Sequence, residues 1–196
     1  MTLEQIRAHG IVGAGGAGFP AHVKLAAAVE TVIVNAAECE PLLHKDKEIL
    51  KHHAEQVLAG LAIARTLVGA RRAVIGIKEK YQEVIDLLGR FTGPDLVLQP
   101  LQDYYPAGDE FLLVWEVTGR VIPPGGLPRD VGALVMNVET LFNLAAGVPV
   151  TRKFLTVAAE VKRPVTVCVP LGVSYRECVE LAGGAAVPDY ALLVGG

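Results

Sequence analysis

Four glycines crowd into one short loop near the start of the chain. Gly13, Gly15 and Gly18 match the dinucleotide-binding pattern G-x-G-x-x-G, and Gly16 adds a fourth glycine. Such a loop lets the backbone approach a phosphate, and helix-end N–H groups supply donors. Lys24, about one turn into the next predicted helix, could reach that phosphate as a point charge. The loop therefore predicts an anion or cofactor site, with a tight structural turn and a solvated lysine as the alternatives.

Polar side chains also follow three predicted strands, at the point where each strand ends. They are Asn35, Glu38, Glu40, Asp109, Glu110 and Asn137. Open α/β sheets bind ligands outside the carboxyl ends of their strands, so these residues and the glycine loop should converge on one edge. A helix rather than a strand precedes the loop, which argues against an ordinary Rossmann fingerprint. Asp46 and Glu48 could add oxygen ligands for a metal ion, but we expect no metal site.

The elements that position these residues alternate between strands and helices. The β-branched run Thr31–Val34 is typical of a strand buried on both faces of a parallel sheet. The pattern therefore predicts a Rossmann-like α/β domain over residues 1–150. Further strands are expected at 72–77, 96–101 and up to 136, and helices at 2–10, 45–68, 79–88, 111–117 and 137–147.

The pattern changes at Thr151. Short strands are expected at 154–158, 165–169 and 190–194, with a helix at 174–181 between the last two. Two strands, a helix and another strand indicate part of a small β-grasp module over residues 151–196. The sequence therefore predicts a boundary near residue 150.

Composition narrows the class of protein. The chain has 196 residues, 52% of them hydrophobic, with 18 Lys and Arg against 21 Asp and Glu. It is too apolar for a disordered chain and too acidic for a nucleic-acid surface. The chain has three cysteines, Cys39, Cys168 and Cys178. They cannot complete a disulfide framework, which indicates a reducing compartment. They also cannot supply the four thiolates that an iron–sulfur cluster normally takes. No apolar run reaches the roughly 20 residues of a membrane span.

Four blocks together resemble one flavoprotein family. They are GAGGAGFPAHVK at 13–24, NAAECEP at 35–41, YPAGDE at 105–110 and NVETL at 137–141. Their order and spacing are similar to those of the NADH-binding flavoprotein subunit of respiratory complex I and the RnfC-type electron-transport subunits. The runs VNAAECEPLLHKD, IKEKY and VTGRVIPPGGLP are most similar to the cobalamin-reductase branch found in propanediol-utilisation microcompartments. The segment after Thr151 is similar to the SLBB β-grasp module.

The resemblance implies FMN reduced by NADH, with electrons passed to 4Fe-4S clusters and then to cobalamin or a ferredoxin-type acceptor. No catalytic side chain is expected, because the hydride chemistry belongs to the cofactors. The flavin positions implied are Gly13, Gly15, Gly16, Gly18, Asn35, Glu38, Tyr105, Gly108, Asp109, Glu110 and Asn137, with Lys24 near the FMN phosphate. Phe19 and Glu40 correspond to positions near the nicotinamide dinucleotide.

The expected partners are NADH, an electron acceptor and other subunits of an electron-transport or microcompartment assembly. The expected location is the cytoplasm, with the inside of a bacterial microcompartment or the periphery of a membrane complex as alternatives. Nucleic acid is not expected. Ala21, Ala37 and Ile122 depart from the complex I pattern, which weakens the inference on NADH contacts more than that on FMN. The cysteine-rich cluster segment of the family is expected beyond Gly196. A binding module without turnover and an NAD-binding protein without flavin remain the alternatives.

Overall fold

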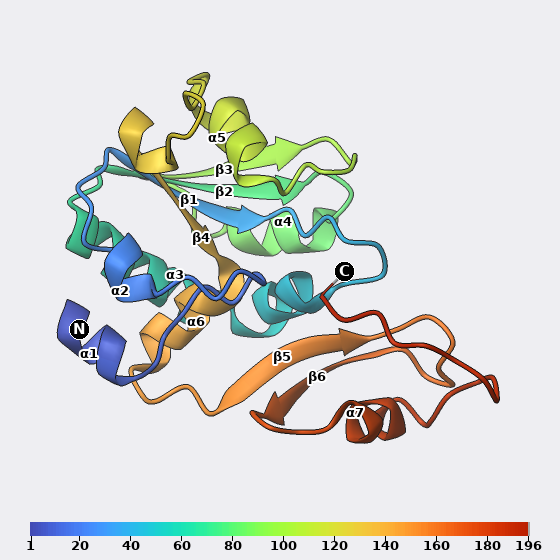
Figure 1. The fold of residues 1–196 in the computed structure, drawn as a ribbon. Coiled ribbons are helices and arrows are strands. Elements are labelled where there is room, and N and C mark those ends of the chain that lie inside the picture. Colours follow the sequence, from blue (N-terminus) through green and yellow to red (C-terminus); the bar gives the residue numbers. More distant parts are fainter. Residues whose placement is uncertain (196) are drawn as a thin grey trace.

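The computed structural model describes residues 1–195, and its centre is a parallel four-stranded sheet (Figure 1). The strand order is β3-β2-β1-β4, and every neighbouring pair is parallel. The strands are β1 Thr31–Ala36, β2 Arg72–Lys78, β3 Leu96–Leu101 and β4 Ala133–Asn137. The predicted α/β class with a parallel sheet is confirmed.

Side chains of the two central strands alternate between two apolar layers. Val32 and Val34 of β1 are fully buried on the face that packs against α3, α4 and α6. Ile33, between them, is buried on the opposite face with Leu113 of α5. Because both faces are covered, β1 is a continuous β-branched run rather than an alternating one. This burial fixes the strand so that its carboxyl end carries Asn35 and the residues that follow.

The helices agree closely with the sequence pattern. They are α1 Leu3–Ala8, α2 Ala21–Lys24, α3 Lys45–Val68, α4 Gln82–Gly89, α5 Glu110–Thr118, α6 Val138–Ala146 and α7 Tyr175–Leu181, with a 3₁₀ turn η1 at Pro128–Val131. Thr2 and Gln5 form the capping box that begins α1. Inside α3, His53 leaves helical geometry (φ −138°, ψ 31°). Among residues 1–195, no helix combines the length and apolarity needed to cross a membrane.

A two-stranded antiparallel hairpin lies below the sheet and its helices (Figure 1). It consists of β5 Arg152–Val157 and β6 Val165–Pro170, and α7 follows it. The hairpin contacts α3, where the His44 N–H donates to Thr156 Oγ1 at 3.2 Å and the Phe154 ring meets His53 edge-on.

The predicted strand at 190–194 is wrong. These residues have no regular secondary structure, and Leu193 is 97% exposed. An apolar run becomes a strand only where a neighbouring strand pairs with it, and this run pairs with no strand of residues 1–195. Two strands and a helix of the expected β-grasp arrangement are present, and its assignment stays a prediction.

The closest helix packing occurs where α3 crosses α6. Gly60 of α3 lies so near Leu141 that a Cβ at position 60 would stand 1.9 Å from the Leu141 carbonyl oxygen. A glycine is required there because a backbone atom cannot yield as a flexible side chain can. The contact sets the depth at which α6 sits, and α6 begins at the candidate site.

We predict that Gly60→Ala destabilises the protein by roughly 3 kcal/mol, at the upper end of ordinary overpacking. Urea unfolding followed by circular dichroism measures the loss. Gly89→Ala is the matched control, because a Cβ at that helical glycine meets no atom within 4 Å. It should leave stability unchanged or raise it by roughly 0.5–1 kcal/mol. Equal stability of Gly60→Ala and wild type would contradict the packing described here.

Candidate functional site

The glycine loop between α1 and α2 closes on itself and leaves donors free. The Gly13 N–H donates to Phe19 O at 2.7 Å, and the Gly18 N–H donates to Gly13 O at 3.2 Å. Gly16 and Gly18 have φ values of 123° and 65°, which favour glycine. The N–H groups of Gly15 and Gly16 donate to no group of residues 1–195. These donors belong to the loop rather than to the N-terminus of a helix, because the helix that follows, α2, is only 4 residues long.

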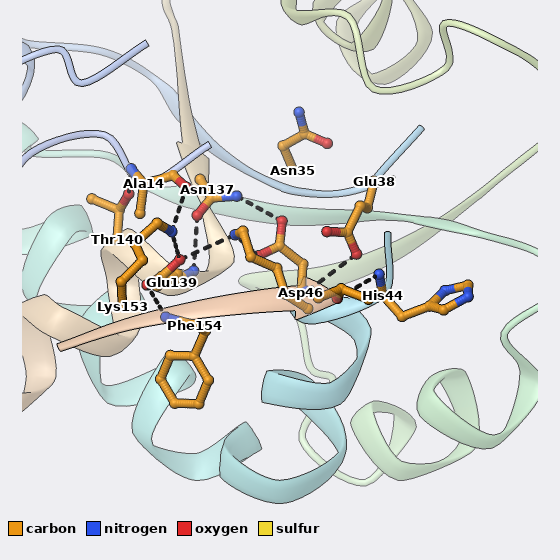
Figure 2. Close-up of polar contacts among 12 residues, drawn as sticks. Ala14, Asn35, Glu38, His44, Asp46, Asn137, Glu139, Thr140, Lys153 and Phe154 are labelled. Carbon is orange, nitrogen blue, oxygen red and sulfur yellow. Dashed lines mark hydrogen bonds and ion pairs between the residues drawn. The ribbon is translucent and has the colours of Figure 1, made fainter. Parts of the chain in front are cut away.

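Both polar groups of Ala14 are held by side chains from distant parts of the chain. The Ala14 N–H donates to Thr140 Oγ1 at 2.9 Å, and the Ala14 carbonyl accepts from Lys153 Nζ at 3.2 Å (Figure 2). A Cβ at Gly15 would lie 3.5 Å from the Asn137 side chain. The loop therefore lies against the end of β4 and the start of α6.

A second contact closes the end of β1. The Asn35 Nδ2 donates to Gly108 O at 2.8 Å, and Asn35 Oδ1 accepts from the Ala37 N–H at 3.2 Å. A Cβ at Gly108 would stand 2.5 Å from Ala37 O, so this close approach requires glycine. The structure thus brings Asn35 and Gly108 together, as the convergence at the carboxyl edge predicts.

Lys24 and Glu110 form an ion pair at 2.7 Å, with 29% and 37% of their side chains exposed. Asp109 caps α5, because its Oδ1 accepts from the N–H groups of Phe111 and Leu112 at 3.0 Å each. Lys24 is therefore already paired with a carboxylate, and a bound phosphate would share the positive charge of Lys24 with Glu110.

The two aromatic positions singled out in the sequence are exposed. Phe19 is 51% exposed and Tyr105 is 72% exposed. Large apolar groups at this level of exposure are available to a ligand. Neither side chain makes a hydrogen bond or ring contact within residues 1–195.

Glu38 and Glu40 line a cavity of about 220 Å³ at the sheet edge, together with Lys78, Lys80 and Tyr81. Glu38 Oε2 also accepts from the Asp46 N–H at 3.2 Å. Burial, followed by the negative charge of Asp46, raises the pKa of Glu38 to about 7. Glu38 therefore changes charge in the physiological pH range, beside the Asp46 carboxylate.

A buried charged network beneath the glycine loop was not predicted from the sequence. Glu139 is 1% exposed and Asp46 is 4% exposed. Lys45 bonds to both, at 2.6 Å to Asp46 and 3.2 Å to Glu139. Lys153 pairs with Glu139, and the second Glu139 oxygen accepts from the Phe154 N–H at 2.9 Å (Figure 2).

The network also reaches the predicted site at the end of β4, where Asn137 Nδ2 donates to Asp46 Oδ2 at 2.7 Å. Burial lowers the pKa of Lys45, but the charges of Asp46 and Glu139 outweigh it and the net pKa is raised. Burial, followed by repulsion from Lys45, lowers the pKa of Lys153. The NVETL block contains Glu139, so the signal for this residue was present in the sequence.

Comparison with known proteins identifies the family. The protein-family model described as the Nuo51 FMN-binding domain matches residues 6–146. This chain belongs to that family. The expected membership in the family of complex I flavoprotein and RnfC-type subunits is therefore confirmed, and the match includes the glycine loop and all three strand ends.

Individual relatives agree. Cobalamin reductase PduS of Citrobacter freundii is 50% identical over 197 residues, covering 98% of this chain and 44% of the relative. A subunit of the Na⁺-translocating ferredoxin:NAD⁺ oxidoreductase complex of Acetobacterium woodii is 37% identical over 198 residues, covering 95% and 45%. A crystal structure of the NAD⁺-reducing [NiFe]-hydrogenase in the H2-reduced state superposes with a TM-score of 0.81 at 27% identity, covering 96% of this chain and 39% of that one. The chain spans less than half the length of each.

We predict that Glu38 makes stability depend on pH. Its pKa is about 7 in the folded protein and 4.5 in its ordinary state. The contribution of Glu38 to the free energy of unfolding is therefore fully present below pH 4.5 and is lost as the pH rises through 7. Glu38→Gln cannot ionise, so it should gain about 2–3 kcal/mol relative to wild type between pH 4.5 and 7.5, at about 1.4 kcal/mol per pKa unit.

Urea unfolding at a series of pH values measures this difference. Glu55→Gln, which replaces an exposed carboxylate on α3, is the matched control and should show almost no trend relative to wild type. A constant difference between Glu38→Gln and wild type across the range would show that folding does not raise the pKa of Glu38.

Proposed function

We propose that this chain is the flavin end of an NADH-oxidising electron-transfer flavoprotein. Membership of an FMN-binding family supports the proposal. The observation that carries it is the glycine loop, fixed at Ala14 against the start of α6 with the N–H groups of Gly15 and Gly16 left free. Such a loop offers backbone donors to an anionic cofactor at the carboxyl edge of a parallel sheet.

The residues present fit FMN. A flat ring needs a surface without bulky side chains, which Gly13, Gly15 and Gly16 provide. Ring carbonyl and nitrogen groups need amide partners, which Asn35 and Asn137 provide at neighbouring strand ends. The loop and the block at 105–110 approach β1 and β4, so the proposed site lies between them.

The charge of the cofactor needs a partner as well. Lys24 is the cation we assign to the phosphate of FMN, and Glu110 holds its ammonium group in place at 2.7 Å. Glu38, Asp109 and Tyr105 complete the proposed flavin surroundings. When bound, FMN takes two electrons from NADH and gives them up singly.

For NADH, Phe19 and Glu40 are the proposed contacts. The Phe19 ring is exposed and can stack on a planar base, whereas Glu40 can accept hydrogen bonds from a ribose or carboxamide. This chain therefore binds and orients both partners, and none of its side chains needs to act as a general acid or base.

Beyond this chain, we propose that electrons continue through 4Fe-4S clusters of the whole protein. The acceptor would be cobalamin, as the name of the PduS relatives suggests, or a ferredoxin-type protein, as the name of the Acetobacterium woodii relative suggests. Residues 151–196 would form the first part of an SLBB module. The protein would work in the cytoplasm as a subunit of an electron-transport or microcompartment assembly.

The proposal is tested by anaerobic mixing of FMN-loaded protein with NADH. The protein should retain yellow flavin after desalting, and NADH should bleach its visible absorbance. Failure of both this chain and the full-length protein to retain FMN would contradict the proposal. Flavin that stays oxidised in the full-length protein would favour a binding module without turnover, and tight NAD binding without any flavin would favour a simple dinucleotide-binding protein.

We predict that Lys24→Ala weakens FMN binding by about tenfold to a hundredfold. A charge-assisted hydrogen bond contributes about 1.5–3 kcal/mol, and about 1.4 kcal/mol corresponds to a factor of ten in Kd. Quenching of flavin fluorescence measures the Kd. Lys51→Ala is the matched control, because it breaks a surface ion pair of the same 2.7 Å length, to Glu83. Equal losses in both variants would remove Lys24 from the proposed site.

A further inference from the structure

The glycine loop is fixed by a residue that lies outside the FMN-binding family match. That match ends at residue 146, and Lys153 stands in β5 of the hairpin. The Lys153 ammonium donates to the Ala14 carbonyl at 3.2 Å across 139 residues of chain. Figure 2 shows the side chain rising from β5 to the loop, beside the Thr140 hydroxyl that holds the Ala14 N–H.

Glu139 keeps the Lys153 ammonium in this position. The carboxylate is 1% exposed and makes an ion pair with Lys153 through Oε2, while its Oε1 accepts from the Phe154 N–H at 2.9 Å. The two oxygens of the buried Glu139 carboxylate therefore bind two neighbouring residues of β5, Lys153 through its side chain and Phe154 through its backbone N–H. This arrangement fixes both the height of β5 and the direction of the Lys153 side chain.

Lys153 is not the only cation that balances the buried negative charge of Glu139. Lys45 also reaches Glu139 Oε2, at 3.2 Å, so the buried carboxylate keeps a cation when Lys153 is removed. The Ala14 carbonyl, in contrast, has no other donor within residues 1–195. Loss of Lys153 should therefore act mainly on the loop.

Ala14 is also the residue next to the free donors. The Thr140 hydroxyl on one side and the Lys153 ammonium on the other set the orientation of the two peptide groups that flank Ala14. The peptide group between Ala14 and Gly15 carries the Gly15 N–H, one of the unused donors of the loop. Rotation of this group would turn the donor away from its present direction.

We propose that Lys153 is a positioning residue for the flavin: by holding the Ala14 carbonyl it orients the Gly15 N–H, and it makes the hairpin part of the cofactor site. This inference rests on the proposed binding of FMN at the glycine loop. It adds a segment of the chain to the site, because residues 6–146 alone lack the donor to Ala14.

The test compares FMN affinity in Lys153→Met, Lys153→Arg and wild type, by quenching of flavin fluorescence. Lys153→Met keeps the apolar stem and removes the charge, so its Kd should rise about tenfold, as expected for one charge-assisted hydrogen bond. Lys153→Arg keeps a cationic donor and should return the Kd to within about threefold of wild type. Lys162→Met, on an exposed lysine of the hairpin loop, should leave the Kd unchanged.

Two further measurements separate positioning from a purely structural role. Urea unfolding of the flavin-free variants should give similar midpoints, because Lys45 remains beside Glu139. Amide hydrogen exchange at Ala14, whose N–H donates to Thr140, should be faster in Lys153→Met than in Lys162→Met. If Lys153→Met does not fold, Lys153→Gln, which keeps a neutral donor on a shorter stem, takes its place.

The outcomes are distinct. If wild type binds no FMN, the proposed function is wrong and this inference falls with it. If wild type binds FMN and the folded Lys153 variants bind equally well, only the role of Lys153 is overturned. A rise in Kd that arginine reverses, with unchanged unfolding midpoints, supports the inference.

Discussion

A single buried carboxylate, that of Glu139, joins the parts of this molecule. It receives the ammonium groups of Lys45 from α3 and Lys153 from β5, and a backbone N–H from Phe154. A carboxylate at 1% exposure requires such partners, because an unpaired buried charge is strongly destabilising. Removing both cations would cost roughly 3–5 kcal/mol, the range found when a buried pair is broken. The positions of the hairpin and of the glycine loop therefore both follow from this one group.

The same charge system extends to the strand ends. Lys45 also holds Asp46, Asp46 accepts from Asn137, and the Asp46 N–H donates to Glu38. The negative charge of Glu38 also acts on Lys45, where it adds to the charges of Asp46 and Glu139 that raise the pKa. In a buried network the interactions are only weakly screened, so neighbouring members influence one another's ionisation. The proposed flavin site lies directly above this system.

The sequence allowed the fold and the site to be predicted wherever the signal was local. The helix from Lys45 to Val68 was predicted with its observed bounds, and the loop glycines stood out because their density is unusual for a solvated turn. The strand expected at 190–194 failed, because pairing depends on a partner that a local pattern does not reveal. The charged network was missed for a similar reason. Glu139 lies in the first turn of α6, where an acidic residue is favourable and usually solvated, and Lys153 resembles an ordinary surface lysine of a strand. Only the assembled fold buries these two residues against each other.

The break at His53 interrupts the regular geometry of α3. Both parts are anchored in the same apolar core, because Ile49 and Leu50 before the break are buried in the same cluster as Val57 and Leu61 after it. The His53 ring meets Phe142 of α6 and Phe154 of the hairpin edge-on, at 5.2 and 6.2 Å between ring centres. The residue that leaves helical geometry is thus the one whose ring joins α3 both to α6 and to the hairpin.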